Sequence, residues 1–294
     1  MTTLATEPPT SPAPRAATGP ASRTRPDGLR ARLRRTGSLV RAETRLLLRN
    51  RTALFNGLAL APAMVAFLHV TGTFEALAAA DPGASVGALA LVSLACFALM
   101  FVVYYNLASA YVARREELVL KRLRTGQVTD AEILAGAATP AVVTLLGQLV
   151  LGGAAVALWI GLDVPTNLVL VLVALLGGTF VFTTLAAAST AFTRTLESAQ
   201  LSTLPIMAVA LLFSGVTLPL DVLPDPVQVI AQLTPLHAVA ELLGTGLTGV
   251  GPDGATYSFV ESFAAGAAPL AVLAAWCLAG AWLAGRYMSW EPRR

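Results

Sequence analysis

The chain has 294 residues, of which 55% are hydrophobic and only 13% are charged. Soluble domains average about 25% charged residues, and several apolar stretches here exceed the roughly 18 residues that mark a membrane-span candidate. The composition therefore excludes an ordinary soluble protein and predicts an integral membrane protein. The formal net charge of +3 does not indicate nucleic acid as a partner, because the basic residues are distributed as expected for orientation in a lipid bilayer.

The N-terminal part of the chain has two compositions. Residues 1–28 are rich in Pro, Ala, Thr and Ser, and they predict a disordered tail rather than a signal peptide. Residues 29–52 are basic, and Arg41, Arg45 and Arg49 recur on one face of a helix with apolar residues on the opposite arc. This pattern predicts an amphipathic helix at the membrane surface, with a solvated basic segment as the alternative.

The remainder, residues 53–294, is predicted to be a transmembrane domain. Six apolar stretches predict spans at residues 53–71, 86–112, 132–160, 167–192, 199–216 and 263–285.

The sequence before the last span, residues 217–262, is broken by Pro219, Pro224 and Pro235. The resulting apolar pieces are too short to cross a bilayer, and they are typical of re-entrant or interfacial helices. A plain external loop is the alternative. The predicted fold class is all-α integral membrane, with an N-terminal amphipathic elbow helix, six spans and short re-entrant helices before the last span.

All the basic residues fall on one side of this six-span arrangement. Eleven precede the first span, five lie between the second and third, Arg194 lies between the fourth and fifth, and three follow the sixth, which accounts for all 20. Because basic residues are retained on the cytoplasmic side, both termini are predicted to be cytoplasmic. Nineteen of the 20 are Arg, which we interpret as the bias of a G- and C-rich bacterial genome, and the bacterial plasma membrane as the location.

Motifs for catalysis and metal binding are absent from the sequence. The single Lys, Lys121, follows Leu rather than Gly, so there is no G-x-x-x-x-G-K-[ST] nucleotide-binding loop. We interpret His69, His237, Cys96 and Cys277 as structural residues, since the histidines are far apart and the cysteines lie in apolar stretches. No enzyme activity, metal or cofactor is expected on this chain.

The interiors of the six predicted spans contain no Asp, Glu, Lys or Arg. Ion-coupled transporters usually place such a residue inside the membrane, so a secondary transporter is disfavoured. It stays an alternative, because unwound backbone can coordinate Na⁺ without acids. A membrane scaffold without transport is a further alternative.

The link ARREELVLKRLRTGQ, residues 113–127, joins the second and third spans and is strongly charged. Glu117 precedes Lys121 by four residues, a spacing that supports a helix, and Gly126 is a natural helix end. A charged helix tied to a span at each end can transmit a push to both spans. A loop that only fixes topology explains these residues equally well.

Two motifs resemble the ABC-2 type permeases, the membrane subunits of bacterial ATP-binding-cassette exporters, in particular the daunorubicin-resistance-like members. The first lies within the link and is similar to the family's coupling pattern R-E-x-G-T-L-K-R-L-R-x-x-P. It matches at Arg115, Glu116, Leu120, Lys121, Arg122, Leu123 and Arg124. Leu118, Val119 and Gln127 depart from the pattern.

The second motif covers residues 213–243 and is similar to the family's S-G-x-x-x-P-x-x-x-x-P pattern. It matches at Ser214, Gly215, Pro219 and Pro224, and Pro235 corresponds to a further Pro downstream in the family's pattern. The basic helix around residues 39–50 is similar to the family's membrane-surface elbow.

This resemblance implies a type V exporter-like fold and a division of labour between chains. Two copies form a transmembrane dimer, and each pairs with a separate ATPase subunit that binds ATP and Mg. The residues implied in contact with the ATPase are Arg114, Arg115, Glu116, Glu117, Lys121, Arg122, Leu123 and Arg124, together with Arg41, Arg45 and Arg49 of the elbow helix.

The cargo is expected to be a hydrophobic or amphipathic compound, such as a drug, an antibiotic or a lipid, because the spans carry no charge. A polysaccharide exporter of the same family is the alternative. Candidate path or gate residues are Tyr104, Tyr105, Asn106, Gln148, Ser214, Pro219, Pro224 and Pro235. Each of the polar ones is equally suited to a helix–helix hydrogen bond.

Overall fold

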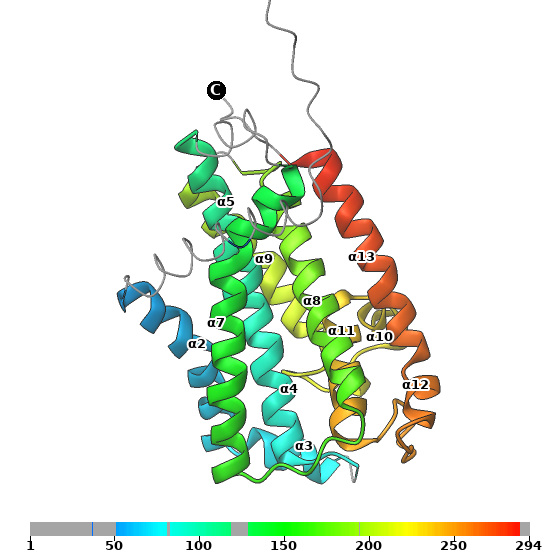
Figure 1. The fold of residues 1–294 in the computed structure, drawn as a ribbon. Helices are drawn as coiled ribbons and strands as arrows, with labels where there is room; N and C mark the ends of the chain where they lie inside the picture. Colours follow the sequence, from blue (N-terminus) through cyan, green and yellow to red (C-terminus); the bar gives the residue numbers. More distant parts are fainter. Residues whose placement is uncertain (1–36, 38–50, 81–82, 119–128, 194, 289–294) are drawn as a thin grey trace, which may run out of the picture.

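The computed structural model is a helical bundle whose longest helices run side by side (Figure 1). It describes residues 37, 51–80, 83–118, 129–193 and 195–288. The predicted tail, nearly all of the predicted elbow helix with its three arginines, and residues Lys121, Arg122, Leu123 and Arg124 lie outside these described residues.

The described part of the chain is almost entirely helical apart from its turns. The elements are α2 (Arg51–Val70), α3 (Thr73–Ala80), α4 (Val86–Ala98), the π-helix η1 (Leu99–Tyr105), α5 (Asn106–Glu116), α7 (Asp130–Trp159), α8 (Leu168–Ser189), α9 (Leu196–Leu212), the 3₁₀-helix η2 (Leu220–Val222), α10 (Asp225–Gln232), α11 (Pro235–Thr248), α12 (Glu261–Ala265) and α13 (Ala267–Tyr287).

Four helical stretches are long and apolar enough to cross a membrane. They are Val86–Glu116, Asp130–Trp159, Leu168–Ser189 and Ala267–Tyr287, and they coincide with the second, third, fourth and sixth predicted spans. A fifth is obtained when Leu58–Val70 and Thr73–Ala79, bent by 62°, are taken as one broken span. The prediction of a multi-pass membrane protein is confirmed, whereas the number of six spans is not reached by these criteria in the part of the chain that the structure describes.

The bend between α2 and α3 has a local cause. Gly72 has a φ of +73°, a left-handed conformation that ends a helix and that glycine adopts without steric cost. The backbone N–H of Gly72 donates to the carbonyl oxygen of His69, which completes the last turn of α2.

Among the described residues, Arg and acidic residues share one end of the bundle, whereas the other end carries acids without Lys or Arg. We call the end that carries Arg114, Arg115 and Arg286 the basic end, at the top of Figure 1, and the end that carries Asp253 and Glu261 the acidic end. Helices α5 and the last turns of α13 reach the basic end, whereas α3 and α12 lie toward the acidic end (Figure 1).

The core of the bundle is the continuous helix formed by α4, η1 and α5. Most of this stretch is buried, and its large apolar side chains include Phe97, Leu99, Met100 and Leu107. The π-helix in its middle widens the helical turns, a feature found frequently at functional sites.

Glycines allow α8 to approach its neighbours closely. A Cβ atom on Gly178 would lie 2.9 Å from Val239 of α11 and 3.1 Å from Leu99 of η1. On α13, a Cβ atom on Gly280 would overlap the hydroxyl of Thr184 of α8. Small residues at helix contacts are what membrane helices use to bring backbones together.

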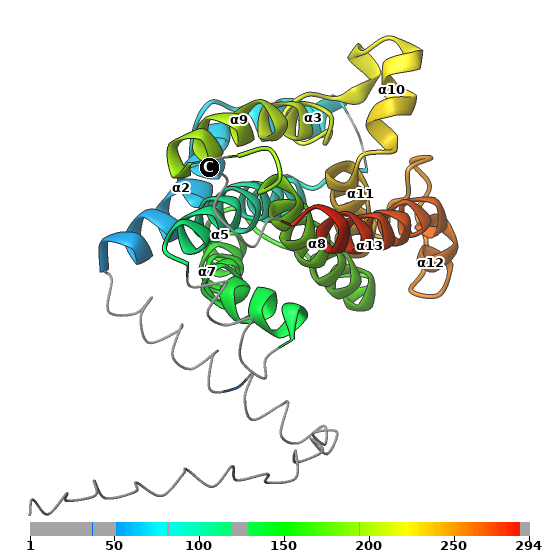
Figure 2. The same cartoon turned by 90° about the horizontal axis from the view of Figure 1, so that it is seen from above.

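Helices α9 and α11 flank opposite halves of the central helix. Helix α9 packs along α5 and η1, whereas α11 packs along α4 and against α8 and α13. Between them the chain passes through η2 and α10, whose Val229 and Ile230 side chains are exposed. Figure 2 shows α10 projecting from the bundle. Short helices do break residues 217–262, as η2, α10 and α11, and α11 is a buried part of the bundle rather than a surface element. Helix α12 lies mostly within the bounds predicted for the sixth span.

Candidate functional site

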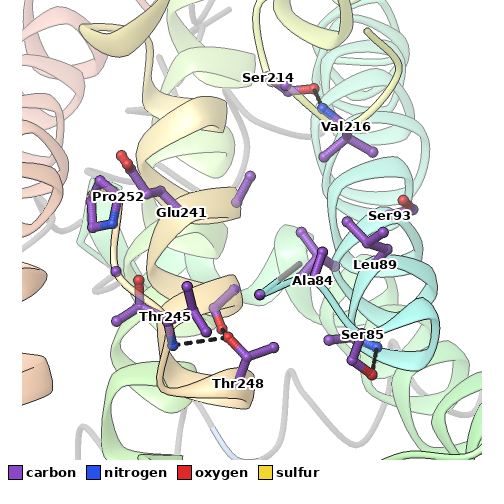
Figure 3. Close-up of a pocket in the computed structure, with 18 of the residues that line it drawn as sticks. Ala84, Ser85, Leu89, Ser93, Ser214, Val216, Glu241, Thr245, Thr248 and Pro252 are labelled. Atoms are coloured by element: carbon purple, nitrogen blue, oxygen red, sulfur yellow. Dashed lines mark hydrogen bonds between the residues drawn. The ribbon is translucent and has the colours of Figure 1, made fainter. Parts of the chain in front are cut away.

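A pocket of about 240 Å³ lies between α4 and α11. Figure 3 shows Ser85, Leu89 and Ser93 on the α4 side, and Glu241 and Thr245 on the α11 side. The turn at the end of α9 and the chain that follows α11 complete the lining, with Ser214, Gly215, Val216, Val250, Gly251 and Pro252.

Local sequence signals position each wall of this pocket. Helix α11 begins after Thr234, whose hydroxyl accepts from the His237 backbone, and it has Pro235 in its first turn. It ends at Gly249, which has a φ of +74°. Helix α4 begins after Ser85, whose hydroxyl accepts from the Ala88 backbone. These caps fix the residues at which α4 begins and at which α11 begins and ends, beside the pocket.

The turn that closes α9 is made by Ser214 and Gly215. The Ser214 hydroxyl donates to the carbonyl oxygen of Leu211 at 2.6 Å and accepts from the Val216 N–H at 3.1 Å. Gly215 has a φ of +79°, which lets the chain reverse. Helix α9 therefore stops at Leu212, four residues before the predicted end of the fifth span.

His237 and Glu241 are the only ionisable groups among the described residues that line the pocket. The Nε2 atom of His237 lies 3.2 Å from Oε2 of Glu241, and its Nδ1 atom lies 3.2 Å from the carbonyl oxygen of Ser214. Both ring nitrogens thus face oxygen acceptors. An imidazolium ring donates to both, and a neutral ring to only one.

Sequence reasoning missed Glu241, because it placed residues 217–262 outside the membrane-spanning part. The structure instead puts this carboxylate on a helix that packs against α4, α8 and α13. The absence of ionisable residues from the predicted spans therefore does not extend to the interior of the bundle. The available signal was a His and a Glu four residues apart on the apolar sequence LHAVAELL, which places both on one helical face.

A second acid lies directly after the pocket lining, at Asp253. The Tyr257 hydroxyl donates to Oδ2 of Asp253 at 2.5 Å, and the Ala255 N–H donates to Oδ1 at 3.1 Å. The hydroxyl of Tyr257 is the main reason why the pKa of this exposed carboxyl lies below its usual range. Asp253 is therefore ionised at neutral pH.

The predicted path residues do not form one cavity in the described structure. Ser214 lines the pocket, whereas Tyr104 is buried beside α8 with its hydroxyl 3.0 Å from that of Ser189. Tyr105 is half-buried and Asn106 is exposed. None of these three lines the pocket.

Gln148, another predicted path residue, is buried on α7 and does not line the pocket. The predicted prolines start successive helices. Pro219 and Pro224 directly precede η2 and α10, and Pro235 opens α11. They shape the segment that leads into the pocket rather than lining it.

At the basic end, the structure describes four of the residues expected to contact an ATPase. Glu116 and Glu117 are exposed and Arg114 is half-buried. Arg115 is fully buried, and its Nη1 and Nη2 atoms donate to the carbonyl oxygens of Thr190 and Thr193, both at 2.7 Å. This side chain therefore joins the end of α5 to the end of α8.

A second bond fixes the same turn of α5 to α7. The Tyr111 hydroxyl donates to the carbonyl oxygen of Leu134 at 3.2 Å. Together with Arg115, it ties the helix that precedes the charged link to two other membrane-spanning candidates.

The family model for the ABC-2 type transporter matches residues 34–246. This range contains the charged link, the central helix, and α11 as far as Gly246. No curated protein matches the chain. The matched domain is the membrane component of ABC transporters rather than the ATPase, and members normally pair with an ATP-binding subunit. The apolar helices of the described structure agree with such a role. The chain belongs to the ABC-2 type transporter family.

Proposed function

We propose that this permease subunit exports a hydrophobic or amphipathic compound, such as a drug, an antibiotic or a lipid, from a bacterial cell. Two copies assemble with two copies of a separate ATPase, which binds ATP and Mg. Both termini and the basic end of the bundle face the cytoplasm, where the ATPase is located. The elbow helix with Arg41, Arg45 and Arg49 also faces the ATPase. The chain is assigned to the daunorubicin-resistance-like subtype of the family.

The observation that carries this proposal is the way Arg115 joins the charged link to the bundle. The link begins within the last turn of α5, and the guanidinium of Arg115 holds this turn to the carbonyl groups of Thr190 and Thr193, directly after α8. A displacement of the link is therefore passed to α4–η1–α5 and to α8 together. Glu116 and Glu117 are exposed beside this joint, and with Lys121, Arg122, Leu123 and Arg124 they form the proposed ATPase contact.

Co-purification with the ATPase tests the proposal. The permease is expected to retain a soluble ATPase whose sequence contains a phosphate-binding loop, and Lys121→Glu together with Arg124→Glu is expected to release it, because the charge reversal removes both attractive contacts. Arg286→Glu is the matched control, since Arg286 is an exposed cation of the basic end outside the link. Vesicles that hold both subunits are expected to move cargo only with ATP.

Three results would contradict parts of this scheme. Equal retention of the ATPase by the link variant and the control would remove the proposed contact. Cargo movement by the permease alone, driven by an ion gradient without ATP, would make it a secondary transporter. ATP-dependent movement of a polysaccharide in place of an amphipathic compound would reassign the cargo within the same family.

A further inference from the structure

We propose that the pocket between α4 and α11 binds the ammonium group of an amphipathic amine, with Glu241 as its counter-ion. This inference rests on the proposed function, because it names the chemical class of the cargo. The charge, the hydrogen-bonding groups and the size of the pocket support it.

The charge around the pocket favours a cation. Residues 195–285 and residues 52–113 contain no Lys or Arg. Both walls of the pocket therefore come from segments without basic residues other than His. Glu241 lines the pocket, and the ionised Asp253 follows Pro252 of its lining. An anionic ligand would find only His237 as a basic group among the described lining residues, and that ring already faces Glu241 and the Ser214 carbonyl group.

The polar groups of the lining suit a hydrogen-bond donor. An ammonium group has three N–H donors and no acceptor. Besides the carboxylate of Glu241, the pocket offers the hydroxyl groups of Ser85, Ser93, Ser214, Thr245 and Thr248. A hydroxyl oxygen has two acceptor lone pairs, and those of Ser85, Ser214 and Thr248 each use one of them for a backbone N–H. The described lining contains no Phe, Trp or Tyr, so a quaternary ammonium group would lack the aromatic faces that bind such cations.

His237 contacts one oxygen of the Glu241 carboxylate, Oε2, at 3.2 Å. Its ring lies between Glu241 and the carbonyl oxygen of Ser214, and it therefore fixes the Glu241 side chain relative to the end of α9. The side chain of Glu241 remains 23% exposed, so it is not fully enclosed by its neighbours.

The size of the pocket limits what enters it. A volume of about 240 Å³ is smaller than the 300–1,000 Å³ or so of sites that enclose a drug-sized molecule. The pocket therefore takes the amine and the first part of its carbon chain. The apolar remainder of the cargo stays outside.

A pair of fluorescent probes tests this assignment on the full-length permease in nanodiscs at neutral pH. Dansylcadaverine carries a primary amine, and its N-acetylated form has nearly the same size without the charge. The wild-type chain is expected to bind the amine about tenfold more tightly than the acetylated probe, because one charge-assisted hydrogen bond is lost on acetylation. Glu241→Gln is expected to abolish this preference while leaving the acetylated probe unaffected.

Two further variants separate the site from general effects. Gly244 lines the pocket, and a Cβ atom there would meet nothing within 4 Å, so Gly244→Val adds volume at the lining without an immediate clash of its Cβ atom. It is expected to weaken binding of both probes. Glu261→Gln removes an exposed acid of the same end of the bundle, and it is expected to bind both probes as the wild type does.

The outcomes distinguish this inference from the proposed function, because the binding assay needs neither ATP nor an ATPase. Equal binding of the two probes by the wild type, or an unchanged preference in Glu241→Gln, would overturn the ammonium site even when ATP-dependent export is observed. Unchanged binding of both probes by Gly244→Val would place the amine elsewhere. Amine binding at Glu241 without a co-purifying ATPase would contradict the proposed function alone.

Discussion

Arg115 is a charged side chain that is completely buried at the end of a membrane-spanning candidate. Burial of a charge is costly unless it is paired or hydrogen-bonded. Here the guanidinium donates to two carbonyl oxygens after the last turn of α8, where the partial negative charge of a helix end favours a cation. The planar fork of Arg reaches both oxygens at once, whereas the single ammonium group of Lys cannot.

This geometry predicts that Arg115 is required for stability as well as for coupling. Arg115→Ala is expected to lower the free energy of unfolding by about 2–3 kcal/mol, because two buried carbonyl groups lose charged donors. Arg115→Lys is expected to recover only part of that loss. Thermal unfolding of the detergent-purified chain measures the effect, with Arg114→Ala as the control for loss of charge and volume. Equal midpoints for the Arg115 and Arg114 variants would show that the buried bonds contribute nothing specific.

Packing between elements depends on glycines at the contacts of α8. Gly177 of α8 faces Leu273 of α13, and Gly280 of α13 faces Thr184 of α8. The Thr184 hydroxyl is already committed, since it donates to the carbonyl oxygens of Val181 and Phe180. A side chain at Gly280 would therefore displace a hydroxyl that already donates to two carbonyl oxygens.

Helix α13 offers a matched pair of glycines that tests this contact. Gly280→Val is expected to cost about 1–3 kcal/mol through overpacking, whereas Gly285→Val is expected to be tolerated, because a Cβ atom at Gly285 meets nothing within 4 Å. Both changes place the same β-branched residue on the same helix, so helix propensity cancels. Unfolding midpoints of the two variants give the comparison, and similar losses in both would assign the effect to the helix itself.

At the scale of the whole molecule, the long apolar runs were predictable from the sequence. A continuous apolar segment inside a bilayer must satisfy its backbone groups internally, which leaves a helix as its structure. The segment at 199–216 departed from its predicted bounds because the Ser214–Gly215 turn stops α9 early. Hydropathy alone gives no weight to such a turn.

The positions that join elements were not predictable from residue type. Asn167 reads as a loop residue, yet it is fully buried, and its amide donates to the Phe259 carbonyl oxygen and the Ser262 hydroxyl. Arg115 reads as one of several cytoplasmic cations, yet it alone of the described charged residues is buried. Both contacts join residues more than 70 positions apart in the sequence, so no local sequence pattern predicts them. The pair of His237 and Glu241 was visible as a spacing, but its location in the bundle was not.

The proposed orientation places the two ends of the bundle on opposite sides of the membrane. Ala131 at the start of α7 and Ala255 in the loop after α11 are both exposed alanines, and they lie toward the basic and the acidic end. In a Cys277→Ala background, Ala255→Cys is expected to react with a membrane-impermeant maleimide in intact cells. Ala131→Cys is expected to react only after permeabilisation. The buried Cys96 serves as an internal control that stays unlabelled in both conditions.

The reverse labelling pattern would turn the basic end outward. A cytoplasmic ATPase could then not contact the link. The Arg115 contact with the end of α8 would then have no movement of the link to transmit. The pocket would then face the cytoplasm, and it would bind the amine before its transport rather than after it. The orientation therefore decides whether Glu241 meets its ligand before or after transport, and this labelling experiment measures it without any knowledge of the cargo.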